Sequence, residues 1–226
     1  MAFYEKSCKI PIIQILTNFG LTLPKYYRKV KSGRIKFPDF KDYCPVCGKA
    51  ECPKFLGFYY RRVVDEKGTY YESFPIARYR CRKGKSKGGD RTFSLLPCGL
   101  IPYCKYSVVF AVEVMELLYI DRKSLKEALD IISLKSADGV FFLNPLTVKR
   151  FKGYVVKAID KILSFGSYKE LTVVLNTPDR VQTFLVWLTG HRKRSPDRVN
   201  YEFYLLAGGY KKNSPFLFGT PYQFRK

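Results

Sequence analysis

The sequence predicts an α+β protein in which a small β domain is followed by a helical domain and a helical C-terminal region. Two segments rich in β-branched and aromatic residues, separated by a turn, predict a β-hairpin in the first half of the chain. Cysteines near both ends of that hairpin indicate a bound metal ion. Further along, capping residues that precede apolar residues at helical spacing predict several helices.

Composition narrows the possible partners. The 226 residues contain 41 Lys and Arg against 19 Asp and Glu, which gives a net charge of +22. So much positive charge repels itself unless a polyanion binds to it, which makes nucleic acid the leading partner and an anionic membrane surface the alternative. We find no membrane-spanning segment and no signal peptide, so we expect no membrane insertion, a cytoplasmic location and reduced cysteines.

Residues 1–42 are predicted to form a basic N-terminal arm. The stretch 24–37 contains six Lys or Arg residues, interleaved with aromatic residues, and no acid. Arg28 and Lys29 in this stretch are candidate contacts to a nucleic-acid backbone, with the aromatic residues available for stacking. The alternative is a solvated basic arm that lies on the core.

Residues 43–105 are predicted to form a zinc-ribbon-like β domain, with strands at 55–64 and 69–81 and a turn at 65–68. Its cysteines have the spacing C-x2-C-x4-C-x28-C, and a ribbon of two complete knuckles would need a further cysteine at Gly84. His191 is the only histidine and lies far along the chain. We therefore expect one structural Zn²⁺ held by Cys44, Cys47, Cys52 and Cys81. The alternative is a set of buried thiols, which is what we expect of Cys98 and Cys104.

The segment from Arg78 to Arg91 is strongly basic. It contains seven Lys or Arg residues and one acid, Asp90. The segment lacks the glycine that a phosphate-binding P-loop has six positions before its lysine. We expect a flexible basic loop suited to phosphate contacts, or else a solvated surface loop. The candidate contacts are Arg82, Lys83, Lys85, Lys87 and Arg91.

Residues 106–165 are predicted to form a helix-turn-helix domain. The helices begin at Ser107, at the capping box formed by Ser124 and Glu127, and at Asn144, and they end near residues 120, 134 and 163. The last helix is the expected recognition helix. Its candidate contacts are Asn144, Thr147, Lys149, Arg150 and Lys152. The connection 135–143 is longer than the usual turn, so a plain three-helix core with a solvated basic face is the alternative.

Residues 166–226 are predicted to form an accessory region. Thr177 and Pro178 are typical of a helix start, and Gly190 is typical of a helix end. The segments after that glycine carry aromatic residues in loop-like or strand-like surroundings, and we derive no role for them.

Several segments together resemble a known family. They are YCPVCG, GFYYRR, IARYRCRKGK, RTFSLLPCGLIPYCKYS and TVKRF. They are similar to uncharacterised transposase-like proteins of bacterial mobile elements, which carry an N-terminal zinc ribbon followed by a helix-turn-helix. The resemblance covers roughly residues 43–155 and implies DNA binding at transposon ends. Gly84 departs from the family, because many relatives complete the second zinc knuckle.

We therefore expect a DNA-binding protein of mobile-element origin that binds duplex DNA and is not catalytic by itself. The region after the helix-turn-helix has few carboxylates and is too short for a transposase catalytic domain. The single histidine offers no Ser-His-carboxylate arrangement. The alternatives are a protein that binds RNA or single strands, and a partner-assembling component of a transposition or defence complex. A homodimer is also compatible with the sequence.

Overall fold

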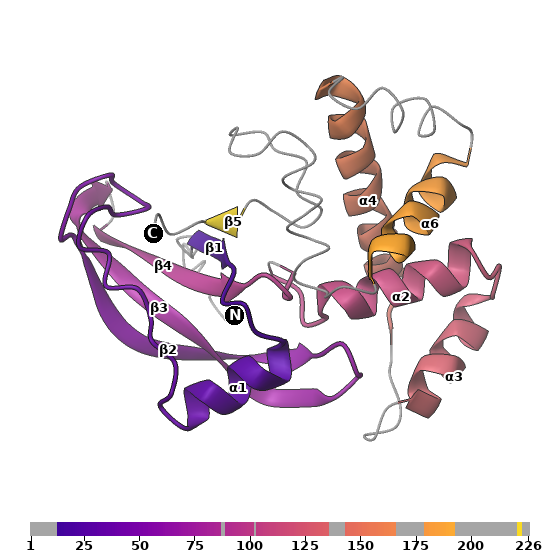
Figure 1. The fold of residues 1–226 in the computed structure, drawn as a ribbon, viewed down its shortest axis with the longest axis horizontal. Helices are drawn as coiled ribbons and strands as arrows, with labels where there is room; N and C mark the ends of the chain where they lie inside the picture. The colour runs from indigo at the N-terminus through magenta and orange to yellow at the C-terminus, as the bar shows by residue number, and fades with distance from the viewer. Residues whose placement is uncertain are drawn as a thin grey trace, which may run out of the picture.

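The computed structural model describes residues 13–86, 89–101, 103–135, 143–165, 179–192 and 221–222. A twisted β-sheet forms one end of the molecule and a group of helices forms the other, as Figure 1 shows. The α+β class predicted from the sequence is confirmed. The sheet carries the cysteines, and the helices carry the predicted recognition segment.

The sheet contains five strands in the order β2-β3-β4-β1-β5. The strands β2, β3 and β4 pair antiparallel, whereas β1 runs parallel to both β4 and β5. Their bounds are β1 Ile13–Thr17, β2 Pro53–Val64, β3 Tyr70–Ser86, β4 Gly89–Pro97 and β5 Pro221–Tyr222. The first and last described segments of the chain are therefore joined in one sheet.

The turn between β2 and β3 is built around a buried aspartate. One Asp65 carboxylate oxygen accepts hydrogen bonds from the backbone amides of Lys67 at 2.8 Å and Thr69 at 2.9 Å. The other oxygen accepts a bond of 3.0 Å from the Tyr71 hydroxyl. A buried carboxylate with three donors is fully satisfied, so it stabilises the turn. The predicted hairpin is confirmed, with both strands longer than the sequence indicates.

The basic segment 78–91 is not a flexible loop in its described part. It forms the closed end of the β3–β4 hairpin, in which Lys85 pairs with Asp90 and Ser86 pairs with Gly89. Apolar residues further along β4 fix this pairing, because Phe93 is fully buried and stacks on Tyr79 with ring centroids 5.3 Å apart. Alternation of charged and apolar residues along these strands is typical of a half-buried sheet. The high number of Lys and Arg residues had instead led to the prediction of a loop.

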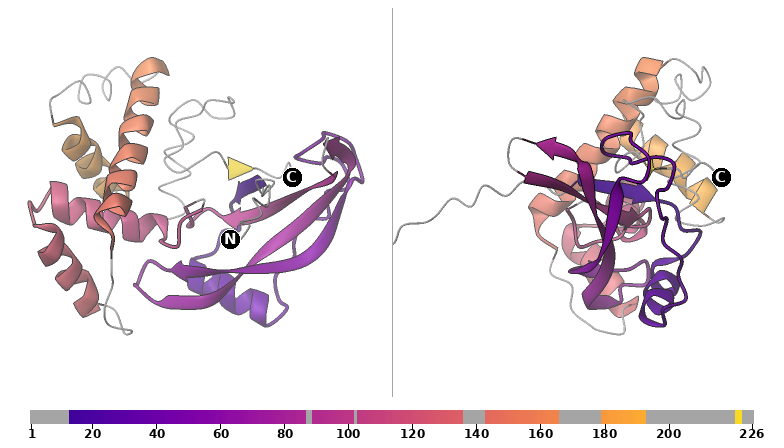
Figure 2. Two further views of the ribbon diagram at one scale, coloured as in Figure 1. Left: turned by 180° about the vertical axis from the view of Figure 1, so that it is seen from behind. Right: turned by 90° about the vertical axis from the view of Figure 1, so that its left-hand side faces the viewer.

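The described part of the predicted N-terminal arm, residues 13–42, packs with the sheet rather than forming a separate arm. Strand β1 pairs with β4, and helix α1, Leu23–Lys31, lies along one face of the sheet (Figure 2). Tyr26 of α1 is fully buried and stacks on Phe74 at a centroid distance of 5.6 Å. The helix therefore buries its aromatic side and turns its basic side chains outward.

The three helix starts predicted between residues 106 and 165 are confirmed. The Ser107 hydroxyl accepts a 3.2 Å bond from the Phe110 amide, and the Asn144 side chain accepts a 2.8 Å bond from the Leu146 amide. Ser124 and Glu127 exchange the two bonds of a capping box, at 2.7 and 3.3 Å. The helices are α2 Val108–Tyr119, α3 Leu125–Lys135, α4 Pro145–Phe165 and α6 Arg180–Arg192.

Helix α2 is the centre of the helical core. It packs against α3, α4 and α6, and α4 also packs against α6. Helix α3 lies on the other side of α2 from α4 and α6, as Figure 1 and the left view of Figure 2 show. The core is filled by Phe110, Phe151 and Phe184, all of them buried. The predicted start of α6 at residues 177–178 lies outside the described residues, and the helix continues past Gly190.

Val64, the last residue of β2, joins the sheet to the helical core. Its amide donates to the Lys105 carbonyl at 2.7 Å, and its carbonyl accepts from the Ser107 amide at 2.9 Å. Its side chain is buried among the core residues of the helices. Because Ser107 caps α2, these bonds place the start of the central helix directly at the end of the hairpin.

We predict that Phe74→Ala lowers the free energy of unfolding by about 3 to 5 kcal/mol, because it removes a buried ring from beneath Tyr26 and leaves a cavity. Chemical denaturation measures this loss. Tyr60→Ala on the neighbouring strand is the control, because its side chain is 57% exposed and should matter little. Equal losses in the two variants would contradict the packing of α1 on the sheet.

Candidate metal centre and basic surfaces

Cys44 and Cys47 lie on a tight turn immediately before the sheet. The Gly48 amide donates to the Cys44 carbonyl at 2.8 Å, and the Cys44 amide donates to the Lys49 carbonyl at 3.0 Å. Gly48 has a φ of 75°, a left-handed conformation that a residue with a side chain adopts only with strain. The turn therefore directs both thiols to the same side, as in a metal-binding knuckle.

Cys52 and Cys81 are brought together by the pairing of β2 with β3. Cys52 is the residue before β2, and the first residue of that strand, Pro53, pairs with Cys81. The Cys52 carbonyl also accepts a 3.4 Å bond from the Arg82 amide. Cross-strand neighbours lie within side-chain reach. Two thiols that are 29 positions apart in sequence therefore face each other.

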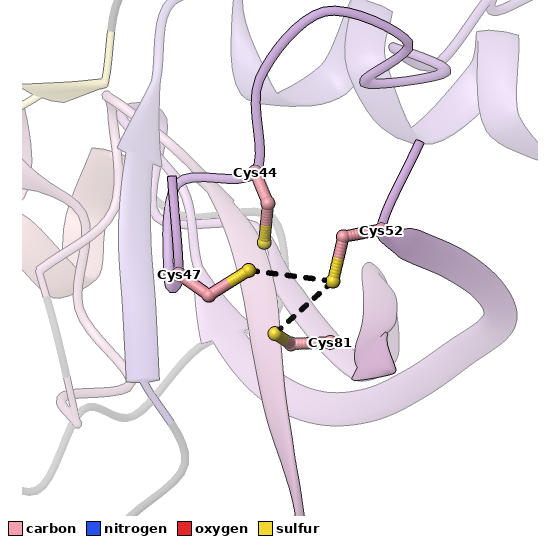
Figure 3. A group of neighbouring side chains, drawn as sticks. All are labelled: Cys44, Cys47, Cys52 and Cys81. Carbon is pink, nitrogen blue, oxygen red and sulfur yellow. Dashed lines mark hydrogen bonds between the residues drawn. The ribbon is translucent and has the colours of Figure 1, made fainter. Parts of the chain in front are cut away.

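The four thiols form one compact cluster, drawn in Figure 3. All four sulfur atoms lie within 4.8 Å of one another. The Cys52 sulfur is 3.4 Å from that of Cys47 and 3.3 Å from that of Cys81, too far for a disulfide bond of about 2.05 Å. A tetrahedral zinc site with Zn–S bonds of about 2.3 Å places its sulfurs about 3.8 Å apart. The four cysteines can therefore coordinate a metal ion.

Backbone amides prepare the thiols to bind a cation. The Lys83 amide donates to the Cys52 sulfur at 3.1 Å. Burial acts to raise the pKa of Cys47, but the Lys49 amide and the neighbouring thiols outweigh it and lower that pKa to about 7. Burial raises the pKa of Cys44 against the opposing amides of Cys47 and Val46. Without a cation the cluster cannot hold four thiolates, because each charge repels the next.

Cys81 is the thiol with the strongest resistance to ionisation. It is fully buried, and burial together with the neighbouring thiols raises its pKa to about 12. Phe40, Tyr79 and Phe93 belong to the same buried cluster as this thiol and join the site to the sheet core. A divalent cation would provide the positive charge that this apolar environment lacks.

Two of the predicted phosphate contacts hold the cysteine turn. Arg82 donates from Nε to the Cys52 carbonyl at 3.2 Å and from Nη2 to the Glu51 carbonyl at 3.1 Å. Lys83 donates from Nζ to the Ala50 carbonyl at 3.1 Å. Both side chains remain exposed. The structure leaves the side chains of the other three predicted contacts outside its description, namely Lys85, Lys87 and Arg91.

Helix α1 carries the densest exposed positive charge among the described residues. Arg28 and Lys29, both predicted as contacts, are exposed on its outer side. The exposed basic side chains of this helix and the segment after it are Lys25, Arg28, Lys29, Lys31, Arg34 and Lys36. They lie on the surface away from the sheet, because Tyr26 turns the opposite side of α1 inward.

The predicted contacts on α4 lie around its first turns. Asn144 caps the helix and is exposed, and Thr147 is partly buried. Lys149, Arg150 and Lys152 are exposed. The Lys152 ammonium lies 5.2 Å from the centre of the Tyr119 ring, which directs it toward the end of α2. The start of α4 is thus accessible, whereas Phe151, Val155 and Ile159 of the same helix are buried.

The predicted helix pair is arranged differently from a simple helix-turn-helix. In that motif two consecutive helices joined by a short turn pack on each other. The principal packing contacts of the described helices join α3 to α2 and α4 to α2, with α3 and α4 on different sides of α2. Helical periodicity predicts where each helix lies in the sequence but not which helices pack against it. The sequence therefore could not predict that α3 and α4 pack on different sides of α2.

Three basic residues that were not among the predicted nucleic-acid contacts lie in the sheet or just before α2. Arg61 of β2 and Arg78 of β3 are partly buried within the sheet, and Lys105 is exposed just before α2. The sequence contains a pattern that could have identified both arginines as candidate contacts. Each occupies a position within an otherwise aromatic or aliphatic strand, where a charged residue is expected to point to a polar partner or to solvent.

Comparison of the chain with protein-family models, curated proteins and solved structures found no match. Among the helices that the structure describes, none combines the length and the apolar character needed to cross a bilayer. What the protein does must therefore be argued from the cysteine cluster and the charged surfaces themselves.

We predict that Cys52→Ser removes most of the bound metal, because it deletes the thiol that lies closest to both Cys47 and Cys81. Metal per chain is measured by inductively coupled plasma mass spectrometry on the purified protein. Cys98→Ala is the control, because Cys98 is buried in the sheet core outside the cluster. A full metal content in the Cys52 variant would rule out the four-thiol site.

Proposed function

We propose that the protein binds nucleic acid, with duplex DNA as its preferred partner, and that the four-cysteine site holds one structural zinc ion. One observation carries the first part of the proposal. Six Lys and Arg side chains between residues 25 and 36 are exposed, and the described part of the chain gives none of them an acidic partner. The polyanionic backbone of nucleic acid is the partner that such a surface binds most favourably.

The absence of ion pairs on this surface distinguishes it from an ordinary charged face. The ion pairs among the described residues are Lys41 with Asp39, Arg62 with Glu72, and Arg180 with Asp160. None of these pairs involves the six side chains of residues 25–36, so their charges repel one another with no carboxylate of the described residues beside them. Phosphates would neutralise them and release counterions, which favours binding and makes it dependent on salt.

Zinc is the metal that best suits the cysteine cluster. Four sulfur ligands at nearly tetrahedral spacing are typical of structural zinc, and no ligand position is left for substrate. A metal here ties the segment 44–52 to β3. The segment also precedes β2 and follows the basic residues 25–36, so the ion would stabilise the end of the sheet next to that surface.

The accessible start of α4 is the part of the molecule suited to read base edges. Arginine and asparagine there can pair with guanine and adenine in the major groove. Helices α2 and α6 would support α4 on the duplex, because they are the helices against which α4 packs. The resemblance to transposase-like proteins makes transposon ends the first duplexes to test, and a transposition complex the setting for any further partner.

A second candidate is the binding of single strands or RNA. Phe55 and Tyr60 of β2 are 42% and 57% exposed, and Lys54, the residue before Phe55, is exposed as well. Exposed aromatic side chains beside a basic residue suit base stacking on a single strand. This observation favours the second candidate. The larger basic surface, however, lies on α1, and its contacts to a phosphate backbone need no unpaired bases, which favours a duplex.

We predict that Lys29→Ala weakens the binding of every duplex to a similar extent and reduces the salt slope by about one, because it removes one phosphate contact. Arg150→Ala should instead cost about 1 to 3 kcal/mol on the preferred sequence and little on random duplex. Fluorescence anisotropy with selected and random duplexes, at several salt concentrations, measures both effects.

Arg62→Ala is the matched control for these variants, because Arg62 is exposed but already paired with Glu72 at 2.9 Å. It should leave the salt slope unchanged. Competition between duplex DNA, single-stranded DNA and RNA decides between the two candidates. Preference for a single strand would contradict the first, and sequence-independent losses from Arg150→Ala would contradict base reading by α4.

A further inference from the structure

Cys52 is the thiol of the cluster whose position depends on a neighbouring strand. Cys44 and Cys47 lie on a turn with its own hydrogen bonds, and Cys81 lies within β3. Cys52, by contrast, comes just before Pro53, the first residue of β2, and a proline has no amide that could donate to β3. The start of β2 therefore needs donors from elsewhere to keep Cys52 beside β3.

Arg82 and Lys83 of β3 supply these donors. The Cys52 carbonyl accepts from Arg82 Nε at 3.2 Å and from the Arg82 amide at 3.4 Å, and the Glu51 carbonyl accepts from Arg82 Nη2 at 3.1 Å. Lys83 donates from Nζ to the Ala50 carbonyl and from its amide to the Cys52 sulfur, both at 3.1 Å. Two consecutive residues of β3 thus hold the three residues that precede β2.

The backbone of the held segment is strained. Glu51 has a φ of 49°, a left-handed conformation that residues with a side chain adopt only at a cost. Its amide donates to the Lys41 carbonyl at 2.8 Å, while its carbonyl accepts from Arg82. A strained conformation persists only where the surrounding contacts enforce it. Loss of the Arg82 guanidinium would therefore allow Glu51 to relax and Cys52 to move away from the other thiols.

The same two basic residues suit the charge of a filled metal site. Four thiolates outnumber the two positive charges of a zinc ion, so the filled site is an anion. Arg82 and Lys83 bring positive charge to the segment that carries Cys52, and the Lys83 amide donates directly to the sulfur of that ligand. Outer groups of this kind orient metal ligands and support their negative charge. Positioning and positive charge thus come from the same side chains.

We propose that Arg82 and Lys83 are positioning residues of the metal site, which hold Cys52 in place for the ion. This role rests on the proposed binding of metal by the four cysteines. It assigns the two side chains to the metal site in place of the phosphate contacts expected from the sequence. Partners that hold metal ligands in this way contribute about 10- to 100-fold to metal affinity, far more than an exposed charge alone.

We predict that Arg82→Ala lowers the zinc affinity by about tenfold or more, because it frees the segment that carries Cys52. Competition with a chromogenic chelator on the purified full-length protein measures this affinity. Lys49→Ala is the matched control, because Lys49 is an exposed cation on the cysteine turn and joins that turn through its backbone carbonyl, which alanine keeps. It should change the affinity by less than about twofold. Equal losses in the two variants would overturn the positioning role.

Arg82→Gln separates hydrogen bonding from charge. The amide nitrogen of glutamine is as many bonds from the backbone as arginine Nε, so it can donate to the Cys52 carbonyl without a charge. Glutamine should therefore recover part of the affinity that alanine loses. Lys83→Ala should cost only about threefold, because it removes one side-chain bond and keeps the amide that donates to the sulfur. A glutamine variant as weak as the alanine variant would overturn the assignment.

Phe74→Leu tests whether a general loss of stability lowers the zinc affinity. Phe74 belongs to a different buried cluster from the thiols, and leucine keeps enough apolar volume for the protein to fold. The variant should unfold at a lower denaturant concentration than wild type and bind zinc with wild-type affinity, with circular dichroism as the check that it is folded. A loss of zinc affinity as large as that of Arg82→Ala would overturn the proposal.

Failure of this role can be told apart from failure of the proposed function. A wild-type protein that binds no zinc would overturn the proposed metal site, and this role with it. Equal zinc affinity in wild type and Arg82→Ala would overturn the role alone. With zinc saturating, Arg82→Ala should leave the salt slope of duplex binding unchanged, whereas Lys29→Ala lowers it by about one. A fall of about one in Arg82→Ala would overturn the assignment, because the guanidinium would then contact phosphate.

Discussion

The register between β2 and β3 is the constraint on which the rest of the molecule depends. Pro53 pairs with Cys81 at one end of this hairpin, and Val64 pairs with Tyr70 at the other. A slip of one residue would turn every side chain of a strand to the opposite face. Cys81 would then point away from Cys52, and Val64 would leave the helical core. The buried Asp65 turn holds the register at its closed end.

The cysteine cluster and the helical core lie at opposite ends of this hairpin. The cysteine end packs on a buried cluster that includes Phe40, Tyr79 and Phe93, and a bound ion would further offset the cost of ordering the segment 44–52. At the other end, α2 lies among α3, α4 and α6 and needs no such support. Loss of the metal should therefore disturb the basic surface before it disturbs α4.

The sequence analysis identified those features that local spacing determines. The four cysteines, the caps at Ser107 and Asn144, and the hairpin followed from residue types at short distances. Long-range pairing did not follow, because nothing local indicates that β1 runs parallel to β4, about 80 positions later. The basic content of residues 78–91 suggested a loop, although alternate apolar residues there form strands. Helical periodicity likewise did not show that α3 and α4 lie on different sides of α2.

If the protein binds duplex DNA as proposed, the length of β2 would limit how it lies on the duplex. The strand has 12 residues and spans about 40 Å at about 3.3 Å per residue. One turn of B-form DNA rises about 34 Å, so the two ends of the hairpin are separated by slightly more than one turn of a duplex. A duplex aligned with β2 would present the same groove to both ends. Strand length would then set the number of base pairs covered.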